Sequence, residues 1–148
     1  MAANTDASAV NVGVKFQSDT AGFITGIRFY KGTGNSGTHV GSLWSSTGTL
    51  LAQATFSGET ATGWQSVTFA TQVAISANTT YIASYLAPNG HYASDQTYFN
   101  TGVDRAPLHA LSSGASGGNG VYAYGASSAM PNNTFNATNY WVDVSFHP

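Results

Sequence analysis

The sequence has no cysteine and very little charge, because Asp, Glu, Lys and Arg together make up only 7% of its 148 residues. Without cysteine, neither a disulfide framework nor a thiol nucleophile is possible. The formal net charge of −2 provides no basic surface for nucleic acid. No apolar run reaches the roughly 18 residues needed to span a bilayer. We therefore expect neither nucleic acid nor a membrane as a partner.

The sequence offers few of the common signatures of catalysis. The HExxH pattern of zinc proteases and the GxxxxGK[ST] phosphate loop do not occur, and the GxSxG pattern of hydrolases is matched only by GASGG (114–118), inside the Gly/Ser-rich run SSGASGG. Asp95 and Asp104 could form the carboxylate pair of a glycosidase, but nothing in their spacing requires it. The sequence therefore predicts a protein that is not an enzyme and that requires no cofactor.

What the sequence does contain is a regular alternation of apolar and polar residues. The runs VNVGVKF (10–16) and FITGIRF (23–29) each place apolar side chains on one face, and the turn between them suggests a hairpin. Such alternation is typical of half-buried strands in antiparallel sheets. Further strands are predicted over residues 39–45, 49–56, 64–70, 79–86, 119–125 and 139–146.

About eight short strands separated by turn residues predict an all-β fold, which we expect to be an antiparallel β-sandwich of jelly-roll type. The first and last strands are expected to pair in one sheet. Residues 10–148 are predicted to form this single module. Residues 1–9 are polar and lack the apolar segment of a signal peptide, so they are expected to be an added or disordered N-terminal extension.

The alternation also predicts which aromatic side chains lie in the core, and it predicts an ion pair across a sheet. Trp44 and Trp64 are expected in the core, and Asp143 is expected to face Arg28 or Lys15 across a sheet. The phenylalanines on apolar faces are expected to be buried, namely Phe16, Phe29, Phe56, Phe69 and Phe146.

One region, residues 87–118, shows no clear strand and holds a large share of the ionisable groups. Loops of this length are usually functional or disordered, and its aromatic residues argue against disorder. Its tyrosines, Tyr92 and Tyr98, could stack on the apolar faces of sugars while polar groups bind hydroxyls. Tyr124, which lies next to this region, could stack on a sugar in the same way. The predicted ligand-binding residues are His39, His91, Tyr92, Asp95, Asp104, Arg105, His109, Asn119 and Tyr122.

Two other interpretations of this region stay open. In the first, Arg105 pairs with Asp95 or Asp104 and the charges only hold the loop in place. In the second, His39, His91, Asp95 and His109 converge on a transition metal. A single structural Ca²⁺ bound by carboxylates and loop carbonyls is neither supported nor excluded.

Several segments taken in order resemble the DUF4082 family: GVKFQSDTAGFITGIRFYKGTGNSGTHVGSLWSSTGTLLAQATF, GWQSVTF, NTTYIASYLAPNGHYA, PLHAL, NGVYAYG and NYWVDVSF. The resemblance covers roughly residues 10–146. It implies a module of bacterial extracellular proteins, found beside Ig-like, fibronectin-like or glycosidase domains. The run GSLWSSTGTLLAQATF and the strands after it also resemble jelly-roll carbohydrate-binding modules in general.

From the resemblance and the loop together we expect an extracellular, non-catalytic bacterial module that binds a polysaccharide or cell-surface glycan and is covalently joined to other domains. The alternatives are a structural or adhesive spacer without a small ligand, and a metal-binding module.

Overall fold

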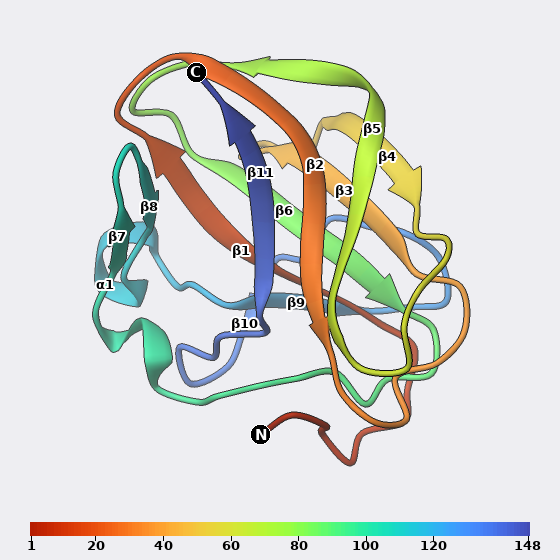
Figure 1. Ribbon diagram of the computed structural model, residues 1–148. Helices are drawn as coiled ribbons and strands as arrows, with labels where there is room; N and C mark the ends of the chain where they lie inside the picture. The colour runs from red at the N-terminus through yellow and green to blue at the C-terminus, as the bar shows by residue number, and fades with distance from the viewer.

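The computed structural model describes all 148 residues and is built almost entirely of antiparallel strands. Two sheets pack face to face, which confirms the predicted β-sandwich (Figure 1). The structure has eleven strands rather than about eight: β1 (Val10–Ser18), β2 (Gly22–Lys31), β3 (Val40–Ser45), β4 (Leu50–Thr55), β5 (Gly63–Ile75), β6 (Tyr81–Ala87), β7 (Val103–Arg105), β8 (Leu108–Ala110), β9 (Val121–Tyr124), β10 (Asn133–Thr134) and β11 (Val142–His147).

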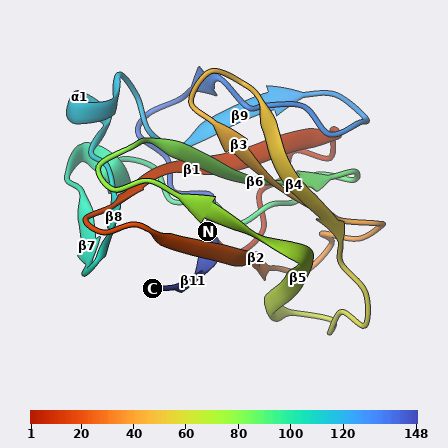
Figure 2. The same ribbon diagram turned by 90° about the horizontal axis from the view of Figure 1, so that it is seen from above.

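The larger sheet has the strand order β10-β9-β1-β6-β3-β4, and the β7–β8 hairpin joins it by pairing with the end of β1. The smaller sheet has the order β11-β2-β5. Figure 2 shows the two layers edge-on, with β2 and β5 on one side and β1, β6, β3 and β4 on the other. Strand β4 lies beside β5 and closes one side of the sandwich. On the other side, the β7–β8 hairpin extends from the end of β1 (Figure 1).

The core forms where the apolar faces of the two sheets meet. Its centre is a stack of Phe29 on Tyr85, whose ring centroids are 4.0 Å apart, and Phe56 meets Phe29 edge-on. Phe16, Phe56 and Phe69 are also buried, as predicted, whereas Phe146 is only partly buried. Trp44 is buried as well, in a small second cluster with Ile82 and Val121.

Strand pairing differs from the prediction in two places. The runs that were expected to form a hairpin, 10–16 and 23–29, lie in different sheets, because β1 pairs with β6 and β9 while β2 pairs with β5 and β11. The first and last strands likewise lie in different sheets. The turn at 19–21 therefore carries the chain from one layer of the sandwich to the other.

The region 87–118 contains more regular structure than its sequence indicated. It forms a 3₁₀ turn, η1 (Tyr98–Asn100), then the β7–β8 hairpin, and then one short helix, α1 (Ser113–Ser116). The hairpin strands have three residues each, which is too short for alternation to be recognised. No helix in the structure has the length and apolar character that crossing a membrane requires.

Residues 1–9, which were expected to be an added or disordered N-terminal extension, lie along the segment that follows β6. The backbone N–H of Asn4 donates to the carbonyl of Tyr92, and that of His91 donates to the carbonyl of Asp6. The ammonium group of Met1 lies 2.6 Å from Oδ1 of Asp95. These contacts join the start of the chain to residues 91–95.

Candidate functional site

A cleft of about 550 Å³ opens between the β7–β8 hairpin and the smaller sheet. We call it the aromatic cleft. Its floor is formed by apolar residues at the open edge of the core, such as Val14, Val103 and Val144. Its walls carry aromatic and polar side chains from both sides, namely Trp64, Tyr98, Trp141, Arg28, Arg105, His109, Asn139 and Asp143.

Trp141 immediately precedes β11 and has a backbone conformation that is unusual for a bulky residue. Its φ is +55°, in the left-handed region that L side chains rarely adopt. Two hydrogen bonds hold the backbone there: its N–H donates to Oδ1 of Asn139 at 2.7 Å, and its carbonyl accepts from the N–H of Tyr30 at 3.0 Å. The strain is therefore maintained by the surrounding structure.

The indole ring of Trp141 is fixed as firmly as its backbone. Its Nε1–H donates to Oδ2 of Asp95 at 2.7 Å, and the ring of Tyr98 meets it at 5.2 Å between centroids and 68° between planes. Tyr98 itself is 38% exposed. The two rings thus form an aromatic corner that is accessible from the cleft.

The carboxylate of Asp95 is part of this corner. The hydrogen bond from the Met1 ammonium, and after it the bond from the Trp141 indole, hold the pKa of Asp95 below its usual value. An isolated bridge between Asp95 and Asn139 aligns the two segments that carry these side chains. Asp95 therefore orients Trp141 as an ionised acceptor.

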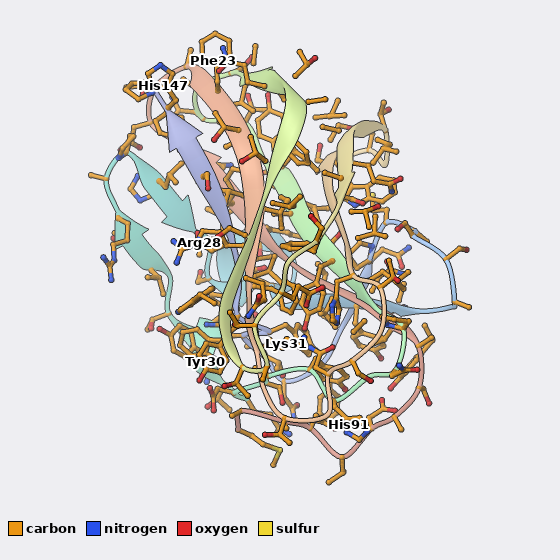
Figure 3. All side chains as sticks on the ribbon, turned by 45° about the vertical axis from the view of Figure 1, so that its right-hand side comes forward. Phe23, Arg28, Tyr30, Lys31, His91 and His147 are labelled. Carbon is orange, nitrogen blue, oxygen red and sulfur yellow. The ribbon has the colours of Figure 1, made fainter.

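The outer face of the smaller sheet supplies the opposite wall. Asp143 on β11 lies directly across from Arg28 on β2, and their charged groups are 3.5 Å apart, which confirms one of the two pairings expected for Asp143. The Arg28 guanidinium also lies over the Trp64 ring, 4.8 Å from its centroid. Tyr30 meets Trp64 edge-on, and Figure 3 shows Tyr30 and Arg28 as neighbours along β2.

Trp64 corrects the prediction that it belongs to the core, because it is 43% exposed. In a regular strand, residues 64 and 69 must point to opposite faces. Phe69 is buried, so Trp64 faces solvent. The parity of the run WQSVTF could have indicated this, since only one of its two large aromatic residues can be inside.

His109 on β8 connects the hairpin with the turn between β1 and β2. Its Nδ1 lies 2.7 Å from Oδ1 of Asp104, and its Nε2 lies 2.7 Å from Oδ1 of Asp19. Both ring nitrogens can donate only when the imidazole is protonated. The hydrogen bond to Asp104, followed by the one to Asp19, raises the pKa of His109.

Arg105 does not form the ion pair that the loop-holding interpretation gave it. Asp95 is bound by Met1 and Trp141, and Asp104 is bound by His109. Arg105 is exposed at the tip of the hairpin and lines the cleft without a carboxylate partner. The hairpin is instead held by His109.

Two of the predicted ligand-binding residues are fully buried and cannot reach a ligand, which corrects their assignment. His39 is enclosed in the core, where Nε2 contacts Oδ1 of Asn35 at 2.7 Å and Nδ1 lies 2.8 Å from Oε1 of Glu59. Asn119 uses its amide to bind backbone groups of Lys15, Leu111 and Gly120. Both residues connect loops to the sheets.

Three more lie away from the cleft. His91 has φ +55° and contacts the Asn4 carbonyl through Nδ1 at 2.9 Å. Figure 3 shows His91 at one end of the sandwich, whereas Arg28 lies midway along it. Tyr92 is buried against Tyr140, and burial raises its pKa to about 12. Tyr122 lies on β9 against Tyr124, outside the residues that line the cleft.

The four candidate metal ligands do not converge. His39 is in the core, His91 is beside residues 4–6, Asp95 is under Trp141, and His109 is bound between two carboxylates. No group of three or more His, Asp or Glu side chains is arranged to hold a metal ion. Of the predicted site residues, Arg105 and His109 line the aromatic cleft. Asp95 and Asp104 form hydrogen bonds with two residues of its lining, Trp141 and His109 respectively.

A family model described as a domain of unknown function, DUF4082, matches residues 1–142. No curated protein matches the sequence.

Proposed function

The chain belongs to the DUF4082 family, and we propose that it is a non-catalytic carbohydrate-binding module of a larger bacterial extracellular protein, with the aromatic cleft as its binding site. The ligand would be a polysaccharide or cell-surface glycan. One sugar ring would stack on Trp141 and Tyr98, and its hydroxyl groups would reach the polar side chains of the walls.

The observation that carries this proposal is the strained, rigid presentation of Trp141 at the cleft. A left-handed backbone costs roughly 1–2 kcal/mol for a residue other than glycine. Such strain persists where the surroundings enforce it, and it is concentrated at functional sites. A ring that is already fixed loses little freedom when a ligand stacks on it, and this favours binding.

The composition of the walls fits a sugar. Sugars combine apolar C–H faces with hydroxyl groups, so their sites pair flat aromatic rings with a few polar groups. Here Tyr98, Trp141 and Trp64 provide rings, while Arg28, Asp143 and Asn139 provide donors and acceptors. The cleft is open to solvent, so we expect modest affinity.

The lowered pKa of Asp95 supports binding without catalysis. A glycosidase needs a carboxyl group whose pKa is raised so that it can donate a proton. The pKa of Asp95 is lowered instead, chiefly by the hydrogen bond from the Met1 ammonium. Its second oxygen is occupied by the Trp141 indole.

The first test is a pull-down with a panel of insoluble polysaccharides, which compares the wild-type protein with a Trp141→Ala/Tyr98→Ala variant. Tyr124→Ala serves as the control, because Tyr124 is another exposed tyrosine, 58% accessible, outside the cleft lining. We expect the double variant to lose binding and the control to retain it. Retention of a glycan by an intact double variant would contradict the aromatic cleft as the binding site, whereas the absence of any bound glycan would favour a structural spacer.

A further inference from the structure

We propose that the aromatic cleft selects acidic sugars, and that Arg105 binds the carboxylate of a uronic acid residue in the polysaccharide. This inference rests on the proposed function and adds the chemical class of the ligand to it. It comes from the distribution of charged partners around the cleft.

Of the four Lys and Arg side chains, three are engaged within the protein. Lys15 donates to the carbonyl of Ser116 at 3.1 Å, Arg28 lies 3.5 Å from Asp143, and Lys31 lies 3.1 Å from Glu59. Arg105 has neither a hydrogen bond nor an ion pair, although it lines the cleft. It is therefore the cation in this wall that is free to bind a ligand.

The carboxylates near the cleft bind other partners, and none of them forms an ion pair with Arg105. Asp104 and Asp19 share His109, each at 2.7 Å, and Asp143 binds Arg28. Asp104 precedes Arg105 on β7, and successive side chains of a strand point to opposite faces. Asp104 binds the His109 imidazole, and the Arg105 guanidinium has no carboxylate partner.

Arginine is suited to a carboxylate, because its planar guanidinium forms two parallel hydrogen bonds with the two oxygens. In a uronic acid the carboxylate projects from the edge of the sugar ring. A ring that stacks on Trp141 and Tyr98 would therefore direct its charged group toward a wall of the cleft, and Arg105 is on the wall formed by the hairpin.

The protein as a whole does not attract polyanions, since its formal net charge is −2. A preference for an acidic polysaccharide would consequently need a local cause. Because the net charge is negative, nonspecific attraction of a polyanion to a basic surface does not contribute to a measured preference for an acidic polysaccharide.

The experiment compares each acidic polymer with a form in which esterification removes the carboxylate charge: polygalacturonate against its methyl ester, and alginate against its propylene glycol ester. Isothermal titration calorimetry measures the dissociation constant of each. For at least one pair we expect the acidic form to bind about tenfold or more tightly, the scale of a hydrogen bond between charged groups. Arg105→Gln should remove this difference, and Arg105→Lys should retain part of it.

Lys15→Gln is the matched control, because it removes one positive charge from outside the aromatic cleft lining and should leave the preference unchanged. Melting temperatures should be nearly equal for wild type and Arg105→Gln, since the exposed Arg105 side chain has no internal hydrogen bond or ion pair to lose. Equal binding of acid and ester in both pairs, or binding of neutral polysaccharides only, would overturn the inference while the proposed function stands. If no polysaccharide binds at all, the proposed function fails with it.

Discussion

The indole Nε1–H of Trp141 donates to Oδ2 of Asp95 at 2.7 Å, across a separation of 46 residues. This bond joins the loop after β6 to the start of β11 and fixes the ring that forms the aromatic corner. Its loss should free the indole without emptying the core. We therefore expect Asp95→Ala to weaken glycan binding several-fold and to lower the free energy of unfolding by about 1 kcal/mol.

Asp95→Asn provides the comparison, because an amide oxygen still accepts from the indole. This variant should retain most of the affinity. Calorimetric titration and chemical denaturation of both variants measure the two quantities. An Asp95→Ala protein that binds as tightly as wild type would show that the orientation of Trp141 is unimportant for binding.

The backbone strain at Trp141 predicts an unusual order of stabilities. Glycine adopts a φ of +55° readily, whereas alanine does not. Trp141→Gly should therefore be more stable than Trp141→Ala by about 1 kcal/mol, although both lose the same ring and both should lose glycan binding. Urea denaturation of the two variants measures the difference. If alanine proves the more stable residue, position 141 is not strained in solution.

His109 makes part of the stability depend on pH. Because Asp104, and then Asp19, raise its pKa above 6.5, the folded protein binds this proton more tightly than the unfolded chain does. The stabilisation is fully present below pH 6.5, the ordinary value, and is lost as the pH rises through the folded-state pKa. The stability difference between wild type and His109→Gln should consequently shrink toward alkaline pH. A difference that is constant from pH 6 to about 9 would contradict this.

His39 predicts the opposite slope. Burial lowers its pKa below 6.5, so the unfolded chain takes up this proton more readily. Its contribution is present above pH 6.5 and is lost as the pH falls through the folded-state pKa. His39→Ala should cost about 2–4 kcal/mol at pH 7, because Asn35 and Glu59 lose their partner inside the protein. The variant should also lose less stability than wild type between pH 7 and pH 5, which denaturation at both pH values measures.

Much of the fold could be predicted from the sequence because alternation directly reports which face of a strand is buried. The runs at 10–16 and 23–29 are strands, as expected. Alternation contains no information about partners, so it could not reveal that β1 and β2 belong to different sheets. The hairpin of Val103–Arg105 and Leu108–Ala110 was missed because three residues are too few to show a period.

The site was predicted only in part, for a physical reason. Composition marked residues 87–111 as unusual, and Arg105 and His109 do line the cleft. Tyr98 of this region lines the cleft as well, but the two tryptophan rings come from the start of β5 and from the residue before β11, which only the fold brings opposite the hairpin. In the alternation of residues 139–146 Trp141 falls on the polar side, and its left-handed φ leaves no signature in a single sequence.

Glycan binding in the aromatic cleft is tested most directly by a glycan titration followed through the indole N–H signals in a ¹H–¹⁵N correlation spectrum. The chain has 3 tryptophans and therefore three such signals. Trp141 and Trp64 line the cleft, whereas Trp44 is buried in a separate cluster with its indole bound to Ser84. The proposal predicts that the signals of Trp141 and Trp64 shift with added glycan while that of Trp44 stays in place. A bound glycan that leaves the Trp141 signal unmoved would contradict it.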